Sequence, residues 1–263
     1  MFGVQRLQKI REIIIQQKYV DVQNLSAIIG VSEVTIRRDL DKLQKEGLIV
    51  KAYGGAVLNN DFTENIENNK EGEGKNINDD TEKDCELISQ IAVNMIKGDE
   101  AIFLYGGGIC RHIASKLGDV KKLLVITNDI FVASELYKNP EVRVVVTGGN
   151  LLNNSGVLVG PNVLEILKNT YVNKAFIGLD SIHLKFGYSI ENYEEVEIIK
   201  KIIEISNETI ALANFAAFNT LSFTKIGDLD MFKTVISSKE LPEDYKKYYY
   251  DNFIKLYTSY EFG

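Results

Sequence analysis

The sequence contains few residues of the kinds that build disulfide frameworks, metal sites and catalytic pairs. Only two of its 263 residues are cysteines, Cys85 and Cys110, which is too few for a disulfide framework and typical of a reducing compartment. Neither cysteine has a partner at ligand spacing, so we predict no metal site and no cofactor. The two histidines, His112 and His183, lie too far apart along the chain to indicate a catalytic pair.

Long apolar runs are also missing. The longest, such as residues 123–126 and 144–146, fall far short of the roughly 20 residues that a membrane span requires. The first residues lack the basic-then-apolar pattern of an export signal. Because 45% of the residues are hydrophobic and 25% are charged, the composition excludes a wholly disordered or fibrous chain. We therefore expect a soluble, cytoplasmic protein.

Basic charge is scarce overall but unevenly distributed. The net charge is −7, yet residues 1–57 carry nine Lys or Arg against six Asp or Glu and are net positive. Residues 58–80 carry seven acidic and two basic side chains, and the rest of the chain is acidic too. Since attraction to DNA is screened beyond ~10 Å, a basic head on an acidic body is compatible with DNA binding.

Residues 58–80 separate two regions of different periodicity. The segment holds seven Asn and seven acidic residues, a composition that buries too little apolar surface to offset the entropy of ordering. We interpret it as a linker between a head at residues 1–57 and a larger domain at residues 81–263. A long surface loop within one domain is the alternative.

Three short helices are predicted in the head. Asp21 is a candidate N-cap of the second helix, which Gly30 ends, and Ser32 is a candidate N-cap of the third, which Gly47 ends. The turn between these two helices is only residues 30–32, and so short a glycine-containing turn is typical of a helix-turn-helix. The apolar positions expected to face inward are Leu7, Ile10, Ile14, Leu25, Ile28, Ile29, Ile36, Leu40 and Leu43.

The opposite face of the third helix is polar and rich in basic side chains. Arg37 and Arg38 lie near its N-terminal half, the part of a recognition helix that meets base edges. A solvated outer face would look similar, so the pattern alone leaves both interpretations open. After Gly47, residues 48–57 predict a β-hairpin with a Gly-Gly tip, and such a hairpin makes the head a winged helix.

A longer motif favours DNA binding over a merely solvated helix face. The run VSEVTIRRDL at residues 31–40, with Leu43, Gly47 and the GGA at residues 54–56, resembles the N-terminal domain of the DeoR-type transcriptional regulators. Lys51 and Tyr53 stand where that family usually has Arg and His. The resemblance implies a DNA-binding set of Ser32, Val34, Thr35, Arg37, Arg38, Lys42, Lys51 and Tyr53.

Two members of this set have a specific structural alternative. Thr35 could merely complete a capping interaction with Ser32. Arg38 could merely pair with Asp41, three residues along the same helix.

Beyond the linker, short apolar segments alternate with helical ones. The segments predicted as strands are residues 100–105, 123–127, 142–146, 174–178 and 209–213. This alternation favours an α/β fold with a parallel sheet. It agrees with the family resemblance, which continues here and implies an effector domain similar to ribose-5-phosphate isomerase.

Polar or glycine-rich segments follow several of these strands. Ligands of parallel sheets bind at the carboxyl ends of the strands, and glycine-rich turns that open a helix can hold phosphate through backbone N–H groups. Such glycines can also serve only to make tight turns. Together with the resemblance, these segments give the candidate effector-binding residues Tyr105, Gly106, Gly107, Gly108, Asn128, Gly148, Gly149, Asp180, Glu195 and Asn214.

The chain departs from its relatives at two of these segments. Where relatives typically have Asp-Ser-Gly-Thr-Thr, this sequence has Tyr105 followed by three glycines, so two hydroxyls and a carboxylate are missing. Where relatives usually carry Asp-x-Ser-Lys-Phe, Asn214 and Ala217 occupy the aspartate and lysine positions. The departures indicate an altered, less phosphorylated ligand or a degenerate sensor. Arg111 and Lys185 are the candidate replacements for the lost lysine.

The most economical interpretation is a transcriptional repressor of carbohydrate-metabolism genes. Its expected partners are double-stranded operator DNA, a sugar phosphate or related metabolite, and further copies of the same chain, which would pair two heads on half-sites. A DNA-binding regulator whose decayed sensor only oligomerises is the first alternative. A sugar-phosphate isomerase with an accessory DNA-binding head is the second, with Asp180, His183, Glu191 and Glu195 as its candidate bases.

Overall fold

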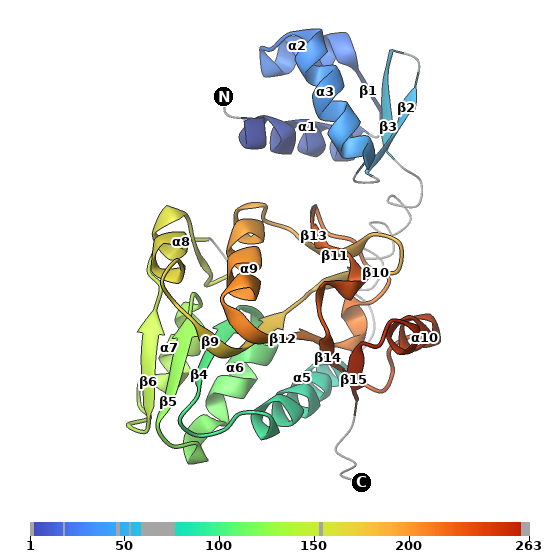
Figure 1. Ribbon diagram of the computed structural model, residues 1–263. Helices are drawn as coiled ribbons and strands as arrows, with labels where there is room; N and C mark the ends of the chain where they lie inside the picture. The colour runs from blue at the N-terminus through green and yellow to red at the C-terminus, as the bar shows by residue number, and fades with distance from the viewer. Residues whose placement is uncertain are drawn as a thin grey trace. The chain divides into compact units, whose positions relative to one another are not determined.

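The computed structural model describes residues 3–17, 19–45, 48–52, 54–58, 77–152 and 155–258. Contacts within the chain divide it into two compact units, Met1–Gly74 and Lys75–Gly263, which we call the head and the α/β unit (Figure 1). No helix in the described part of the chain combines the length and the apolar character needed to cross a membrane.

The described residues of the head form three helices and a three-stranded antiparallel sheet with the strand order β1-β3-β2. Asp21 accepts a hydrogen bond from the Asn24 backbone and caps the second helix, and Gly30 ends that helix in a left-handed conformation with φ 75°. The second and third helices, which a short turn joins, form the predicted helix-turn-helix, and the sheet adds the predicted wing. Its elements are α1 (Gly3–Gln17), β1 (Tyr19–Asp21), α2 (Val22–Ile29), α3 (Glu33–Lys45), β2 (Ile49–Ala52) and β3 (Gly55–Leu58).

The apolar side chains of the head meet in one core. Most of the positions predicted to face inward are buried, namely Ile10, Ile14, Leu25, Ile29, Ile36, Leu40 and Leu43. Ile28 is an exception, because its side chain is 45% exposed. The buried face of the short helix α2 is made by Val22, Leu25 and Ile29, whose spacing of three and four residues leaves Ile28 off that stripe.

Both ends of the predicted linker, residues 58–80, belong to regular secondary structure. Strand β3 includes Leu58, and helix α5 (Ile77–Asn94) begins before the predicted domain start at residue 81. Residues 59–76, which make up most of the predicted linker, lie outside the described residues, as does Gly47.

The α/β unit is built on a seven-stranded sheet with the order β15-β14-β12-β9-β4-β5-β6, in which every neighbouring pair is parallel. The predicted α/β class with a parallel sheet is confirmed, and all five predicted strands are present within a few residues. The strands are β4 (Ala101–Tyr105), β5 (Leu123–Thr127), β6 (Val142–Val146), β9 (Val172–Gly178), β12 (Ser206–Ala213), β14 (Thr234–Ser237) and β15 (Lys255–Tyr257).

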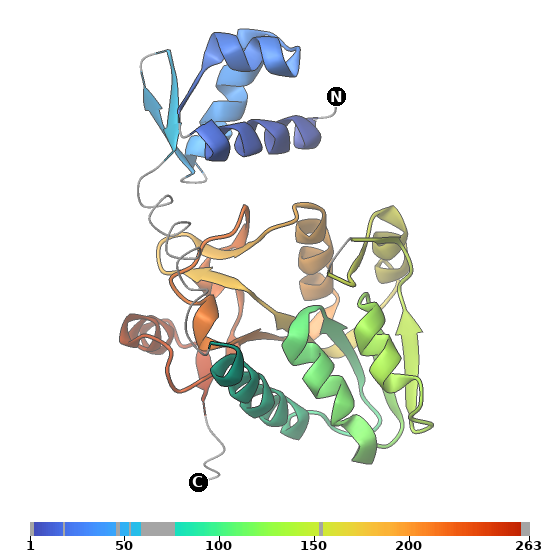
Figure 2. The ribbon, with the colours of Figure 1, turned by 180° about the vertical axis from the view of Figure 1, so that it is seen from behind.

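Helices cover both faces of this sheet (Figures 1 and 2). Alternation along the strands separates two cores: Phe103 and Tyr105 belong to one, and Ile102 and Leu104 to the other. Helices α5, α6 and α7 pack on the second core, in teal to green in Figure 2. The remaining helices pack on the first. The helices after α5 are α6 (Gly107–Ser115), α7 (Ile130–Leu136), α8 (Pro161–Leu167), α9 (Glu194–Glu204) and α10 (Glu243–Asp251).

Two small antiparallel sheets accompany the main one. Strands β10 (Ser181–His183), β11 (Gly187–Ile190) and β13 (Thr224–Gly227) form the first, and β7 (Asn150–Leu151) and β8 (Leu158–Val159) form the second. The segment that follows β9 leads directly into β10. The first small sheet therefore stands near the carboxyl end of a central strand.

The strand order places a topological switch point beside β4. From β4 the chain adds β5 and β6 on one side and then returns to add β9 on the other, with Tyr105 of β4 opposite Ile177 of β9. The connections that leave these two strands run in opposite directions across the sheet. Crevices that bind ligands form at such points in open α/β sheets.

Candidate functional site

The outward face of α3 carries the charges that the sequence predicts. The buried positions of α3 are Ile36, Asp39, Leu40 and Leu43. The exposed positions include Val34, Arg37, Arg38, Lys42 and Lys45, and the side chain of Val34 is 62% exposed. The predicted contacts on this helix therefore share one accessible surface, which we call the α3 face.

Ser32 and Thr35 form the capping interaction that the sequence suggested at the start of α3. The Ser32 and Thr35 hydroxyls lie 3.0 Å apart, and the Thr35 backbone N–H donates to the Ser32 oxygen at 3.4 Å. The structural alternative for Thr35 is thus present in the fold. Ser32 is exposed and Thr35 is half-buried, so both hydroxyls remain accessible from solvent.

The cations of the α3 face differ in their partners. Arg37 pairs with Glu33 one turn earlier at 3.2 Å, an exposed pair of the kind that contributes little to stability. Arg38 has no ion pair with any described residue. The alternative pairing of Arg38 with Asp41 is not formed, because Asp41 is bonded to Lys51 of the wing instead. Tyr53, the other predicted wing contact, lies outside the described residues.

Asp39 connects the recognition helix to the first helix. Its carboxylate is buried and accepts hydrogen bonds from Arg6 Nε at 2.6 Å and Nη2 at 3.4 Å. This contact was missed in the sequence. Its signal was the position of Asp39, three residues after Ile36 and next to Leu40 on the inward side of the helix.

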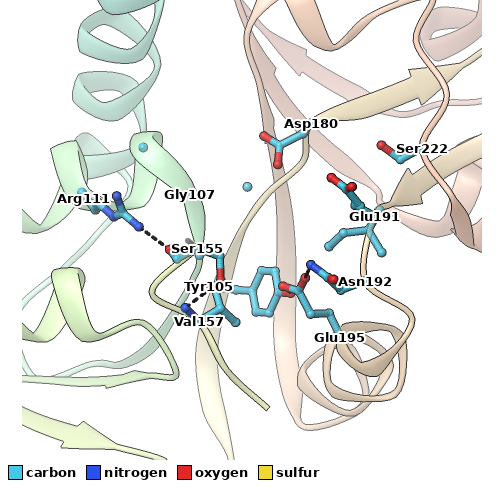
Figure 3. Close-up of a pocket in the computed structure, with 14 residues that line it drawn as sticks. Tyr105, Gly107, Arg111, Ser155, Val157, Asp180, Glu191, Asn192, Glu195 and Ser222 are labelled. Atoms are coloured by element: carbon cyan, nitrogen blue, oxygen red, sulfur yellow. Dashed lines mark hydrogen bonds between the residues drawn. The ribbon is translucent and has the colours of Figure 1, made fainter. Parts of the chain in front are cut away.

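A second candidate site lies in the α/β unit at the switch point. A pocket of about 360 Å³ is lined by residues that follow β4, β9 and β11 (Figure 3). Six of the predicted effector-binding residues line it: Tyr105, Gly106, Gly107, Gly108, Asp180 and Glu195. The structure thus brings together residues that are up to 90 positions apart in the sequence.

Four other predicted residues lie outside the lining of this pocket. Asn128 is fully buried and donates to the Leu158 carbonyl at 3.0 Å. Gly148 and Gly149 have positive φ, and a Cβ on Gly149 would lie 2.6 Å from the Val159 carbonyl, so close packing requires glycine there. Burial raises the pKa of the Cys85 thiol, and the Asn214 side chain acts on it in the opposite direction.

Glu195 is buried in the pocket wall, and both of its carboxylate oxygens accept a hydrogen bond. The Tyr105 hydroxyl donates to its Oε2, and the Asn192 amide donates to its Oε1 at 3.2 Å. Burial raises the pKa of Glu195 above its usual value, although both hydrogen bonds act in the opposite direction. Burial and the neighbouring Glu195 carboxylate also hold the pKa of Tyr105 well above its usual value, so the phenol remains a donor.

Asp180 follows β9 by two residues and lies between Arg111 and Glu191 in Figure 3. Its carboxylate is reached by solvent through the pocket, yet the surrounding protein desolvates it enough to raise its pKa. Arg111, which the sequence suggested as a replacement cation, also lines the pocket. Lys185 does not.

Several lining residues were not predicted as effector ligands. Ser155, Asn192 and Ser222 come from loops beside the small sheets and the start of α9, and Glu191 immediately follows β11. No local pattern marks them, because each becomes a pocket residue only when distant loops meet at the strand ends.

The thiol beside the glycine loop is shielded from solvent. Cys110, beside the glycine loop, is fully buried, and burial raises the pKa of its thiol far above the usual value. Among the residues that the structure describes, no group of three or more His, Cys, Asp or Glu side chains is arranged to hold a metal ion.

Known proteins resemble the chain along most of its length. A family model for a DeoR-like helix-turn-helix domain matches residues 6–62, and one for a DeoR C terminal sensor domain matches residues 81–239. A putative aga operon transcriptional repressor of Escherichia coli O157:H7 is 30% identical over 91% of this chain and 88% of its own length. The glycerol-3-phosphate regulon repressor of Escherichia coli strain K12 is 25% identical over 97% of this chain and 99% of its own.

A solved structure also resembles part of the chain. Ribose 5 phosphate isomerase A from Neisseria gonorrhoeae aligns with a TM-score of 0.37 and 13% identity, over 51% of this chain and 52% of that one.

Proposed function

The chain belongs to the DeoR family of transcriptional regulators, and from this premise we propose that it represses carbohydrate-metabolism genes under the control of a small-molecule effector. The observation that carries the proposal is the pairing of an outward cationic helix face in one unit with a pocket at strand ends in the other. The named relatives are transcriptional regulators and not enzymes, which weighs against the isomerase alternative.

In the head, α3 would enter the major groove of operator DNA. Val34, Arg37 and Arg38 stand on the N-terminal half of the exposed face, from which a recognition helix reaches base edges. Lys42 and Lys51 would contact phosphates. The bond between Lys51 and Asp41 is exposed, so a phosphate can replace the carboxylate at little cost.

In the α/β unit, the effector would occupy the pocket at the switch point. A sugar phosphate or related metabolite fits its size and its position at the carboxyl ends of β4 and β9. The backbone N–H groups of Gly107 and Gly108 open helix α6 and would donate to ligand oxygens. The α/β unit would also oligomerise and pair two heads on half-sites.

The DNA-binding part of the proposal can be tested without knowing the operator. Selection from a random DNA library with the full chain should enrich one sequence, and its affinity should fall steeply with salt, because phosphate contacts release counterions. Enrichment of no sequence would contradict the proposal. A selected DNA that is released by a sugar phosphate would support effector control, whereas release by no tested metabolite would favour a sensor that only oligomerises.

A further inference from the structure

The pocket carries an excess of negative charge. Its charged lining residues are Arg111 and three carboxylates, Asp180, Glu191 and Glu195, with neither lysine nor histidine among them. Figure 3 shows Arg111 on one side of the pocket, Glu191 and Glu195 on the other, and Asp180 between them. The acidic groups thus face the space that a ligand would fill.

The positive charge of Arg111 is already matched. Its Nη2 donates to the Ser155 carbonyl at 2.8 Å and to the Asp129 carboxylate at 3.3 Å, and Asp129 is fully buried. The guanidinium also lies 4.2 Å from the centre of the Phe131 ring. Arg111 therefore has little charge left to offset the three carboxylates.

The three carboxylates differ in how they are satisfied. Glu195 accepts hydrogen bonds from Tyr105 and Asn192. No described residue donates a hydrogen bond to the side chain of Asp180 or Glu191. Burial alone raises the pKa of Asp180, and no cation acts to lower it. Asp180 and Glu191 are thus solvent-exposed acceptors without donors in the described part of the chain, and both line the pocket.

The opposite side of the pocket has a different character. Helix α6 begins at Gly107, and the positive end of its dipole, about half an elementary charge, points to that side. This end suits a hydroxyl, carbonyl or phosphate oxygen of the ligand. It provides no donor for the exposed carboxylates of Asp180 and Glu191 on the rest of the lining.

We propose that the effector carries a protonated amine, which sits between Asp180 and Glu191, on a polyhydroxylated body. An ammonium supplies the donors that both carboxylates lack and neutralises part of the pocket's charge. The hydroxyls of the body find partners in Asn192, Ser222 and the glycine loop. This inference rests on the proposed function, since it names the chemistry of the ligand in the same pocket.

Binding of four compounds tests the claim that the effector carries an amine separately from the proposed function. The full chain is titrated calorimetrically with glucose, glucosamine and the 6-phosphate of each, at a pH where the amine is protonated. The amine should raise affinity roughly tenfold, with or without the phosphate, as a charged hydrogen bond would. The effect of the phosphate, and release of the selected DNA, report on the proposed function independently.

Variants of the chain locate the effect. Asp180→Asn and Glu191→Gln should each remove most of the preference for the amine. Glu194→Gln is the matched control, because it removes the same charge from an exposed residue that does not line the pocket. A preference that survives in both pocket variants, equal binding of amine and parent sugar, or binding of none of the four compounds would overturn the inference. DNA binding in the same samples would still decide the proposed function separately.

Discussion

The two units of the chain differ in how their functional residues are assembled. In the head, the proposed DNA contacts come mainly from one helix of 13 residues, so their common face follows from helical spacing. In the α/β unit, the pocket combines residues after β4, β9 and β11 with Ser155 and Val157 from the segment between β7 and β8 and a serine before β13. A surface built from one element is visible in the sequence, whereas a surface built from several distant segments appears only when the sheet is complete.

The two units also use charge differently. The α3 face points its charges to solvent, where Arg37 forms one exposed pair and Arg38 pairs with no described residue. In the pocket, the surrounding protein raises the pKa of Asp180 and Glu195, and of these two side chains Glu195 is the buried one. Exposed charges can exchange partners freely, but buried ones are coupled to the stability of the fold.

The largest effect is expected at the buried charge of the head. Asp39→Ala would leave the Arg6 guanidinium, whose side chain is only 16% exposed, without its carboxylate. We expect a loss of about 3 kcal/mol in the free energy of unfolding of the head, because removing one partner of a buried pair leaves the other uncompensated. Urea titration with hydrogen exchange of head peptides measures it. An effect no larger than that of an exposed pair would remove the contrast between the units.

A smaller effect, on binding and not on stability, is expected at Arg38. Arg38→Ala should weaken binding of the selected DNA by roughly 1–3 kcal/mol if the guanidinium contacts a base, with the stability of the head nearly unchanged. Lys9→Ala, which removes an equal charge from an exposed position on α1, controls for general attraction to DNA. Equal losses in the two variants would exclude a specific contact by Arg38.

Tyr105→Phe tests the coupling inside the pocket. The variant removes the donor to Glu195 Oε2 while keeping the ring, so we expect a loss of about 1–2 kcal/mol in the stability of the α/β unit. The same change at Tyr137, whose side chain is 70% exposed, should be neutral within error. Thermal unfolding of both variants compares them directly, and matching melting temperatures would show that the bond contributes nothing.

The pH dependence of Glu195 gives the finest test. Burial raises its pKa in the fold, so the folded chain holds this proton more tightly than the unfolded chain does. The resulting stabilisation is complete below the unfolded pKa of about 4.3 and is lost as the pH rises through the folded pKa. The unfolding free energy of the wild type relative to Glu195→Gln should therefore fall as the pH rises from about 4.3 through the folded pKa. A difference that stays constant over this range contradicts the assignment.

The sequence predicted the elements that depend on local pattern. The caps of α2 and α3, most inward positions of the head and the five central strands follow from spacing and from turn residues, whereas Ile28 was wrongly placed inward. Strands β14 and β15 were missed because runs of four and three residues carry too little periodicity. The small sheets were missed because their short strands lie within segments that resemble loops.

For the candidate site too, residues with a local signal were predicted and contacts across the fold were missed. Tyr105 and Asp180 were predicted because they stand at strand ends, whereas Glu195 was singled out as a candidate base; all three line the pocket. Asn128 and Gly149 shared those signals but serve packing, because their neighbours fill the space around them. The partners of Arg111 depend on contacts across the fold that no local pattern encodes.

The division of the chain into two compact units has a consequence for engineering. The proposed DNA contacts all precede the polar segment at residues 58–80, and the pocket residues all follow it. A chimaera that joins this head to the sensor of a relative would keep the promoter choice of one parent and the chemical input of the other. Such exchange would make the protein a source of parts for genetic circuits, in which input and output are selected separately.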